Sequence, residues 1–117
     1  MITSLTSDSR RVTPSAAFFA WPGASGDGRR HIAQAIERGC AAVVWEREGF
    51  AWDGARKTPN AGVDGLRSQA GFLANEFYGR PSESMWICGV TGTNGKTSCS
   101  QWLAHILSLK EIKTGVI

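Results

Sequence analysis

A glycine-rich loop between an expected strand and an expected helix constrains the fold of this chain more than any other feature. Residues 86–90 are apolar or β-prone, which predicts a short buried strand. Gly92 and Gly95 then break the pattern, and apolar residues recur near helical spacing between 96 and 109. A strand, a loop and a helix in this order are typical of an α/β domain.

The composition of this loop indicates nucleotide phosphate binding. A helix N-terminus has unpaired N–H groups and a partial positive charge, and glycines let the backbone approach phosphate oxygens closely. Lys96 would reach the β- and γ-phosphates as the catalytic cation, and the Thr97 hydroxyl would bind Mg²⁺. A turn with an incidental lysine is the alternative. The residues expected to bind ATP are Gly92, Thr93, Asn94, Gly95, Lys96, Thr97 and Ser98.

The loop departs from the general P-loop formula, because Val90 stands where that formula has its first glycine. Residues 89–97 read Gly-Val-Thr-Gly-Thr-Asn-Gly-Lys-Thr. This run closely resembles the ATP loop of the Mur ligases and of folylpolyglutamate synthase, which are ATP-dependent amide ligases. The loop alone does not choose between them.

The first half of the chain predicts a β-α-β unit. Residues 16–21 and 41–45 are compact apolar runs that predict buried strands. Residues 29–38 carry apolar positions on one face and end before Gly39, which predicts a helix. Two strands joined through a helix at this spacing are expected to pair in parallel.

The remaining segments are less regular. Residues 1–6 alternate weakly and permit a short strand, whereas residues 46–60 have no sustained period and predict a surface loop that Phe50 and Trp52 pin to the core. Residues 63–78 predict an amphipathic helix.

Composition excludes several classes of protein. The net charge of +3 is mild and the arginines are scattered, so a nucleic-acid groove is disfavoured. The three cysteines form no C-x-x-C pair, and the two histidines complete no zinc pattern, so we expect reduced, buried cysteines. No apolar run approaches membrane-spanning length. We therefore expect a cytoplasmic protein, a monomer with neither a nucleic-acid nor a membrane partner.

The first half of the chain strengthens the resemblance to the Mur ligases. The segments that carry it are Asp8-Ser9-Arg10, Phe18-Phe19-Ala20, Gly23, Asp27-Gly28 and residues 39–43. They resemble the N-terminal domain of the MurE and MurF ligases, which folylpolyglutamate synthases lack. The resemblance implies an α/β fold, with a small mixed α/β uridine-binding domain over residues 1–81. Residues 82–117 would be the first strand, P-loop and helix of a truncated Rossmann-like ATPase domain.

The resemblance also implies which residues bind substrate. A UDP-MurNAc peptide is expected at Ser7 and Ser9 and at the loop Ala24, Ser25 and Gly26. Hydroxyl and amide groups of this kind suit a uracil ring. Arg10 is a candidate partner of the diphosphate, and a structural salt bridge is an equally good interpretation of it.

The chain thus resembles the N-terminal part of a MurE-type Mur ligase. The intact enzyme would add a diamino acid, meso-diaminopimelate or lysine, to UDP-MurNAc-L-Ala-D-Glu through an acyl phosphate, using ATP and Mg²⁺. This piece is expected to be inactive alone, because we identify no acidic partner for Mg²⁺ after the loop and the C-terminal domain is missing. A MurF-type ligase, a kinase-like P-loop enzyme and a non-catalytic uridine-nucleotide-binding module remain alternatives.

Overall fold

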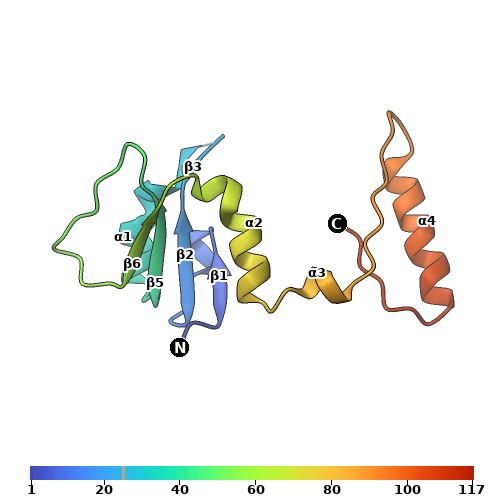
Figure 1. The fold of residues 1–117 in the computed structure, drawn as a ribbon, viewed down its shortest axis with the longest axis horizontal. Coiled ribbons are helices and arrows are strands. Elements are labelled where there is room, and N and C mark those ends of the chain that lie inside the picture. The colour runs from blue at the N-terminus through green and yellow to red at the C-terminus, as the bar shows by residue number, and fades with distance from the viewer. Residues whose placement is uncertain (25) are drawn as a thin grey trace. The chain divides into compact units, whose positions relative to one another are not determined.

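The computed structural model describes residues 1–24 and 26–117. The chain divides into two compact units, Met1–Pro81 and Ser82–Ile117 (Figure 1). That the first unit binds a UDP substrate and the second binds ATP stays a prediction. No helix in the described residues is both long enough and apolar enough to span a bilayer.

A parallel sheet of four strands forms the centre of the first unit (Figure 1). Its strands, in spatial order, are β1 (Ser4–Thr6), β2 (Ala16–Ala20), β5 (Ala42–Glu46) and β6 (Asn60–Val63). Phe18 is in register with Thr6 on one side and with Val43 on the other. All five residues of β2 are buried, as a continuous apolar run in a parallel sheet requires. The α/β class and the parallel pair expected from the sequence are confirmed.

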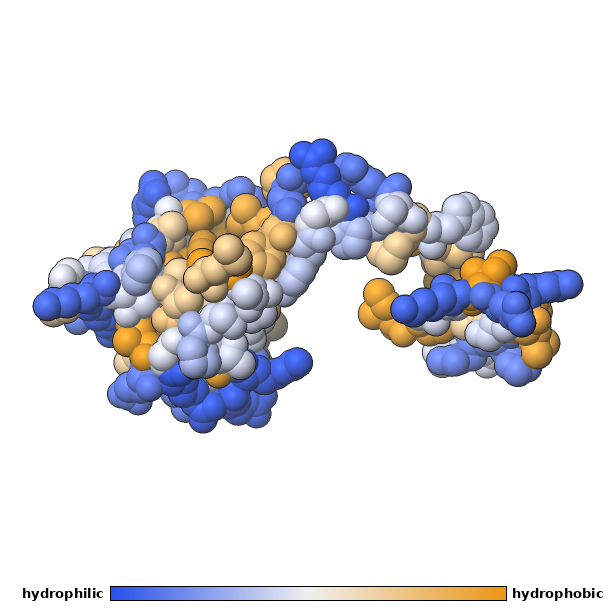
Figure 2. All heavy atoms as spheres, turned by 90° about the horizontal axis from the view of Figure 1, so that it is seen from below, coloured by the Kyte–Doolittle hydropathy of each residue, from blue (hydrophilic) through white to orange (hydrophobic). Residues whose placement is uncertain are grey.

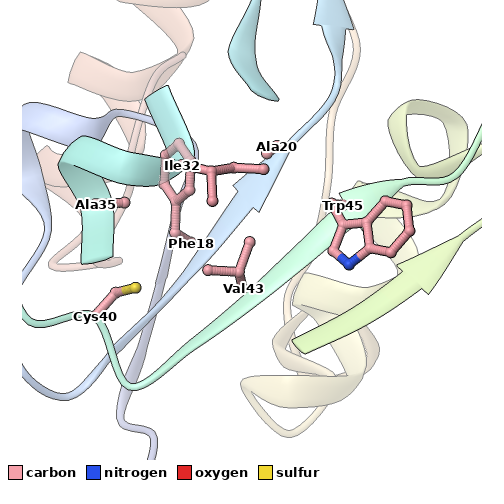
Figure 3. Close-up of a cluster of buried hydrophobic side chains, with 7 residues drawn as sticks. All are labelled: Phe18, Ala20, Ile32, Ala35, Cys40, Val43 and Trp45. Carbon is pink, nitrogen blue, oxygen red and sulfur yellow. The ribbon is translucent and has the colours of Figure 1, made fainter. Parts of the chain in front are cut away.

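Helices α1 (Ile32–Glu37) and α2 (Leu66–Phe77) pack against opposite faces of this sheet. Side chains alternate along a strand, so Phe18 meets α1 while Phe19 meets α2. Figure 3 shows Phe18 reaching from β2 toward Ile32 of α1. The result is a three-layer arrangement with one apolar cluster on each side of the sheet.

Short elements follow the first two strands. The 3₁₀ helix η1 (Ser9–Arg11) comes after β1. An antiparallel pair, β3 (Pro22–Gly23) and β4 (Gly26–Asp27), comes after β2 and leads through η2 (Gly28–His31) into α1. The sequence predicted only a flexible loop at this pair. Gly28 is required there, because a Cβ would lie 2.9 Å from the carbonyl oxygen of Trp21.

The segment between β5 and α2 differs from expectation at its end. Residues 47–59 form no regular element. Phe50 and Trp52 pack, as predicted, against the apolar cluster on the α1 side of the sheet. Residues 60–63, however, form β6, so the helix expected from residue 63 begins at Leu66. The four residues of β6 are Asn-Ala-Gly-Val, a short run in which three of the residue types have a low preference for strands, so the sequence did not predict it.

The Trp45 side chain organises this segment. Its indole stacks on Trp52 at 5.9 Å between ring centroids and meets Phe50 edge-on at 5.5 Å. Its ring N–H donates to Asn60 Oδ1 at 3.1 Å, which holds β6 beside β5. The ring lies so close to Gly62 that any side chain there would collide with it.

In the second unit, α4 (Lys96–Leu109) is the main element, and the short α3 (Pro81–Ser84) leads into the unit. The prediction of a strand over residues 86–90 is wrong, because these residues have no regular structure and Trp86 is 87% exposed. A strand needs a neighbour to pair its N–H and C=O groups, and residues 82–117 contain no strand.

Apolar side chains of this unit remain on its surface. Helix α4 has no buried residue, and Trp102 and Leu109 are 69% and 70% exposed. Figure 2 shows orange, hydrophobic atoms on the surface of this unit. Cys88 and Cys99 are also exposed, so the expectation of buried cysteines holds only for Cys40.

A carboxylate from β5 caps helix α2. The Glu46 side chain is buried, and its oxygens accept hydrogen bonds from the backbone N–H of Gly65 at 3.0 Å and of Leu66 at 2.7 Å. Desolvation, the largest single effect, raises the pKa of Glu46. The amide hydrogen bonds and the Arg29 charge together outweigh it, so the pKa lies below its ordinary value. A strand residue 19 positions before Gly65 therefore supplies the cap.

We expect Gly62→Ala to destabilise the first unit by about 1–3 kcal/mol, the usual cost of overpacking. The new Cβ would lie 2.8 Å from Cζ2 of Trp45 and force the ring to move. Gly71→Ala in α2 is the control, because no atom lies within 4 Å of its Cβ position and alanine favours a helix by about 0.5–1 kcal/mol. Urea denaturation of both variants measures the difference. Equal stability of the two would contradict the packing argument.

We expect Glu46→Gln to lower the melting temperature at pH 7. The glutamine amide is neutral and has only one oxygen, so it cannot accept both backbone N–H bonds as the carboxylate does. A lowered folded-state pKa gives a contribution that is present above the unfolded pKa and lost as pH falls through the folded value. The difference between wild type and variant should therefore shrink toward acid pH. Circular dichroism melts across this pH range measure it, with exposed Glu48→Gln as the matched control. A difference independent of pH would show that the charge of Glu46 does not stabilise the fold.

Candidate functional site

A polar hollow lies next to η1, directly after β1. Its volume is about 660 Å³, and its walls come from η1, the residues before it, the end of η2 and α1. The carboxyl end of a parallel sheet is the usual place for a ligand in folds of this class. The lining residues are Ser7, Asp8, Ser9, Arg10, His31 and Gln34.

The hollow brings together some of the residues expected to bind UDP-MurNAc and not others. Ser7 and Ser9 both line it, one exposed and one buried. Ala24 and Gly26 are exposed in the β3–β4 segment that follows β2, and neither lines the hollow. Ser25 lies outside the described residues.

Ser9 is buried on the floor of this hollow, with 7% of its surface exposed. Its hydroxyl donates to Oε1 of Gln34 at 2.6 Å, which links η1 to α1. His31 is the last residue of η2, and Gln34 follows three residues later on α1, so both can line the hollow. Ser9 could be identified from the sequence but His31 and Gln34 could not, because nothing local in the sequence marks these two polar residues as neighbours of η1.

Asp8 and Arg10 form a closed ion pair at the rim. Two nitrogens of the Arg10 guanidinium donate to the two carboxylate oxygens of Asp8, each at 2.9 Å, and the Arg10 backbone N–H adds a third bond of 2.9 Å. First the guanidinium and then the backbone N–H lower the pKa of Asp8 to about 2. The structural salt bridge considered for Arg10 is thus present, and the Arg10 side chain stays 81% exposed.

The same arrangement recurs after β4, where Asp27 caps η2 and pairs with Arg29 at 2.8 Å. There the arginine is only 9% exposed. It donates to the carbonyl oxygens of Glu46 and Glu48 and lies 5.2 Å from the Phe50 ring centroid. Arg29 therefore fastens η2 to the end of β5, and it is not available to a ligand.

A second, smaller hollow of about 140 Å³ adjoins the first through Ser7. It is mainly apolar and lies on the α2 side of the sheet. The sequence analysis missed it, because its walls come from β1, β2 and α2. The lining residues are Leu5, Thr6, Ser7, Phe19, Trp21, Ala70 and Ala74.

In the second unit, residues 92–95 form a loop that leads directly into α4, whose first turn holds Lys96, Thr97 and Ser98. Gly95 has a φ of 77° and precedes the helix, and Gly92 has a φ of 151°. These are conformations that a side chain disfavours. The ammonium group of Lys96 folds back and donates to the Gly92 carbonyl oxygen at 2.6 Å. No side chain caps α4, so its first N–H groups remain open to an anion.

The residues around this loop supply too few ligands for the Mg²⁺ expected there. Thr97 supplies one hydroxyl, and no group of three potential metal ligands occurs in the described part of the chain. A carboxylate does follow the loop, at Glu111, but it comes after the far end of α4. At 1.5 Å per residue the two lie about 20 Å apart along the helix. These residues therefore do not form a magnesium site on their own.

We expect Arg10→Ala to raise the pKa of Asp8 from about 2 without restoring the ordinary value, because the backbone N–H bond remains. Carbon-detected NMR titration of the aspartate carboxyls measures this change. Asp27 serves as the internal control, since its pKa is lowered by Arg29 and should not respond. An Asp8 pKa that stays near 2 in the variant would show that the guanidinium is not its main cause.

Comparison with known proteins agrees with this geometry. A family model described as "Mur ligase family, catalytic domain" matches residues 1–78. The UDP-N-acetylmuramoyl-L-alanyl-D-glutamate–2,6-diaminopimelate ligase of Nitrosomonas europaea is 48% identical over 116 residues, which are 99% of this chain and 22% of that protein. The enzyme of the same name from Ectopseudomonas mendocina is 48% identical over 117 residues, 100% of this chain and 24% of that protein.

A solved structure shows the same relationship. The MurF ligase of Thermotoga maritima in complex with ADP matches with a TM-score of 0.69 and 26% identity, over 92% of this chain and 23% of that one. This chain spans less than a quarter of the length of each of these proteins. With the family model covering residues 1–78 and the fold shared with a solved member, the chain belongs to the Mur ligase family.

Proposed function

We propose that this chain is the N-terminal part of a MurE-type ligase, which joins a diamino acid to UDP-MurNAc-L-Ala-D-Glu in the cytoplasm. The observation that supports the proposal most directly is the polar hollow after β1, which both Ser7 and Ser9 line. The names of the relatives favour 2,6-diaminopimelate as the diamino acid.

The first unit would bind the uridine diphosphate end of the substrate. A uracil ring offers two carbonyl oxygens and one N–H, and hydroxyl and amide groups in the hollow can match them. The exposed guanidinium of Arg10 lies at the rim, where it can approach a diphosphate without leaving Asp8.

The second unit would contribute the start of the ATP site. An ATP phosphate would accept hydrogen bonds from the open N–H groups of α4 and take the place of the Gly92 carbonyl as partner of Lys96. In the complete enzyme the D-glutamate carboxylate would attack the γ-phosphorus and release ADP. The amine of the diamino acid would then attack the acyl phosphate, form the amide and release phosphate. Lys96 would neutralise charge on the phosphoryl group in transfer.

A non-catalytic uridine-nucleotide-binding module is the second candidate for the chain as it stands. The hollow of the first unit is formed entirely by that unit. The second unit has a phosphate loop but no strand, and Thr97 is the one residue of that loop expected to bind Mg²⁺. UDP-substrate binding without ATP turnover is what such a chain would show.

Calorimetric titration with UDP-MurNAc-L-Ala-D-Glu and, separately, with ATP and Mg²⁺ tests the proposal. We expect the UDP ligand to bind and Ser9→Ala to weaken it by about tenfold, the value of one hydrogen bond to a ligand. Lys96→Ala should leave that affinity unchanged, because Lys96 belongs to the other unit. Absence of UDP-ligand binding would refute the proposal. Binding of ATP alone would indicate a P-loop enzyme of another kind.

A further inference from the structure

Gln34 is a polar residue of the hollow to which nothing yet assigns a role. It lies on α1, is exposed, and lines the hollow beside the buried Ser9. The two residues are 25 positions apart in sequence and are joined by the 2.6 Å bond between Ser9 Oγ and Gln34 Oε1.

The hydrogen-bonding groups of this pair leave donors unused. Ser9 donates its only hydroxyl proton to Oε1, so Gln34 Nε2 keeps both of its N–H donors. No partner of Nε2 occurs among residues 1–24 and 26–117. At the rim, by contrast, Arg10 already has two of its nitrogens on Asp8. The Gln34 amide is therefore held in the hollow through its Oε1, while its Nε2 can still donate to a ligand.

We propose that Gln34 binds the ligand directly, with Nε2 donating to an oxygen of the uridine nucleotide while Oε1 holds the Ser9 hydroxyl. This inference rests on the proposed function, because it takes the ligand of the hollow to be a uridine nucleotide. Such a nucleotide carries acceptor oxygens on both its uracil ring and its phosphates. Gln34 would then fix the orientation of Ser9 and contact the ligand in the same arrangement.

A purely structural role makes a different prediction. If Gln34 only tethers η1 to α1, any acceptor at this position suffices, and glutamate supplies one. Gln34→Glu therefore keeps the acceptor for Ser9 and replaces the free donor with an anionic oxygen. Because Gln34 is exposed, the substitution can be made without disturbing the buried Ile32 and Ala35 of the same helix.

The test is titration of the chain with UDP, for wild type, Gln34→Glu and Ala33→Glu. Ala33→Glu adds the same charge at the neighbouring exposed position of α1, which does not line the hollow. We expect Gln34→Glu to lower UDP affinity by about tenfold or more beyond that control, with an unchanged melting temperature. An affinity within about threefold of the control would overturn the proposal.

Titration with uridine, which has no phosphate, identifies the oxygen that Nε2 contacts. A loss of affinity for both ligands assigns the contact to the uracil or the ribose, and a loss for UDP alone assigns it to a phosphate. If the wild-type chain takes up no UDP, the proposed function fails and this inference fails with it. If wild type binds UDP and Gln34→Glu matches its control, only the role of Gln34 is refuted.

Discussion

Parallel pairing between β2 and β5 is the constraint on which the first unit depends. Parallel strands must each be followed by a connection that returns the chain to the same end of the sheet, so their carboxyl ends meet at one edge. With Phe18 in register with both Thr6 and Val43, the residues after β1, β2 and β5 come together at this edge. The hollow, the β3–β4 pair and the Glu46 cap all lie there. The sheet thus positions the candidate site, although the hollow is lined by connecting elements and not by the strands.

Two copies of one local motif show how tertiary context decides a residue's role. Asp8-Ser9-Arg10 and Asp27-Gly28-Arg29 each place an aspartate before a 3₁₀ helix, where it accepts from the arginine two residues later. The hydrogen bonds are nearly identical, yet Arg10 is 81% exposed and Arg29 only 9%. Phe50 and the carbonyl oxygens of Glu46 and Glu48 surround Arg29, whereas no residue that the structure describes covers the Arg10 side chain in this way. One arginine is structural, and the other remains accessible to a ligand.

The sequence predicted those parts of the fold whose signal is local. The apolar runs of β2 and β5 and the periodicity of α1 and α4 could be read from pattern. The resemblance grouped Ser7 with Ser9, and both line the hollow, although their role as substrate ligands stays a prediction. Strand β6 could not, because its Asn-Ala-Gly-Val residues become a strand only through Asn60, which accepts from Trp45, and Gly62, which makes room for its ring. Gln34 was missed for the same reason, since its contact with Ser9 spans 25 positions. Periodicity reports on neighbours in sequence and carries no information about such pairs.

The turn at residues 92–95 forms from the local sequence alone, whereas the strand expected before it does not form. Gly92 and Gly95 allow the backbone of residues 92–95 to turn into α4, and this geometry needs no support from outside the segment. The strand expected before it has no such independence, because its hydrogen-bonding groups require a partner strand. The loop is therefore formed although residues 82–117 contain no sheet, and the Lys96 ammonium donates to the Gly92 carbonyl oxygen. Under the proposed function, an ATP phosphate would have to displace that contact, so affinity for ATP would depend on the other groups that neutralise and desolvate the phosphates. Helix α4, which has no buried residue, would supply little of that desolvation.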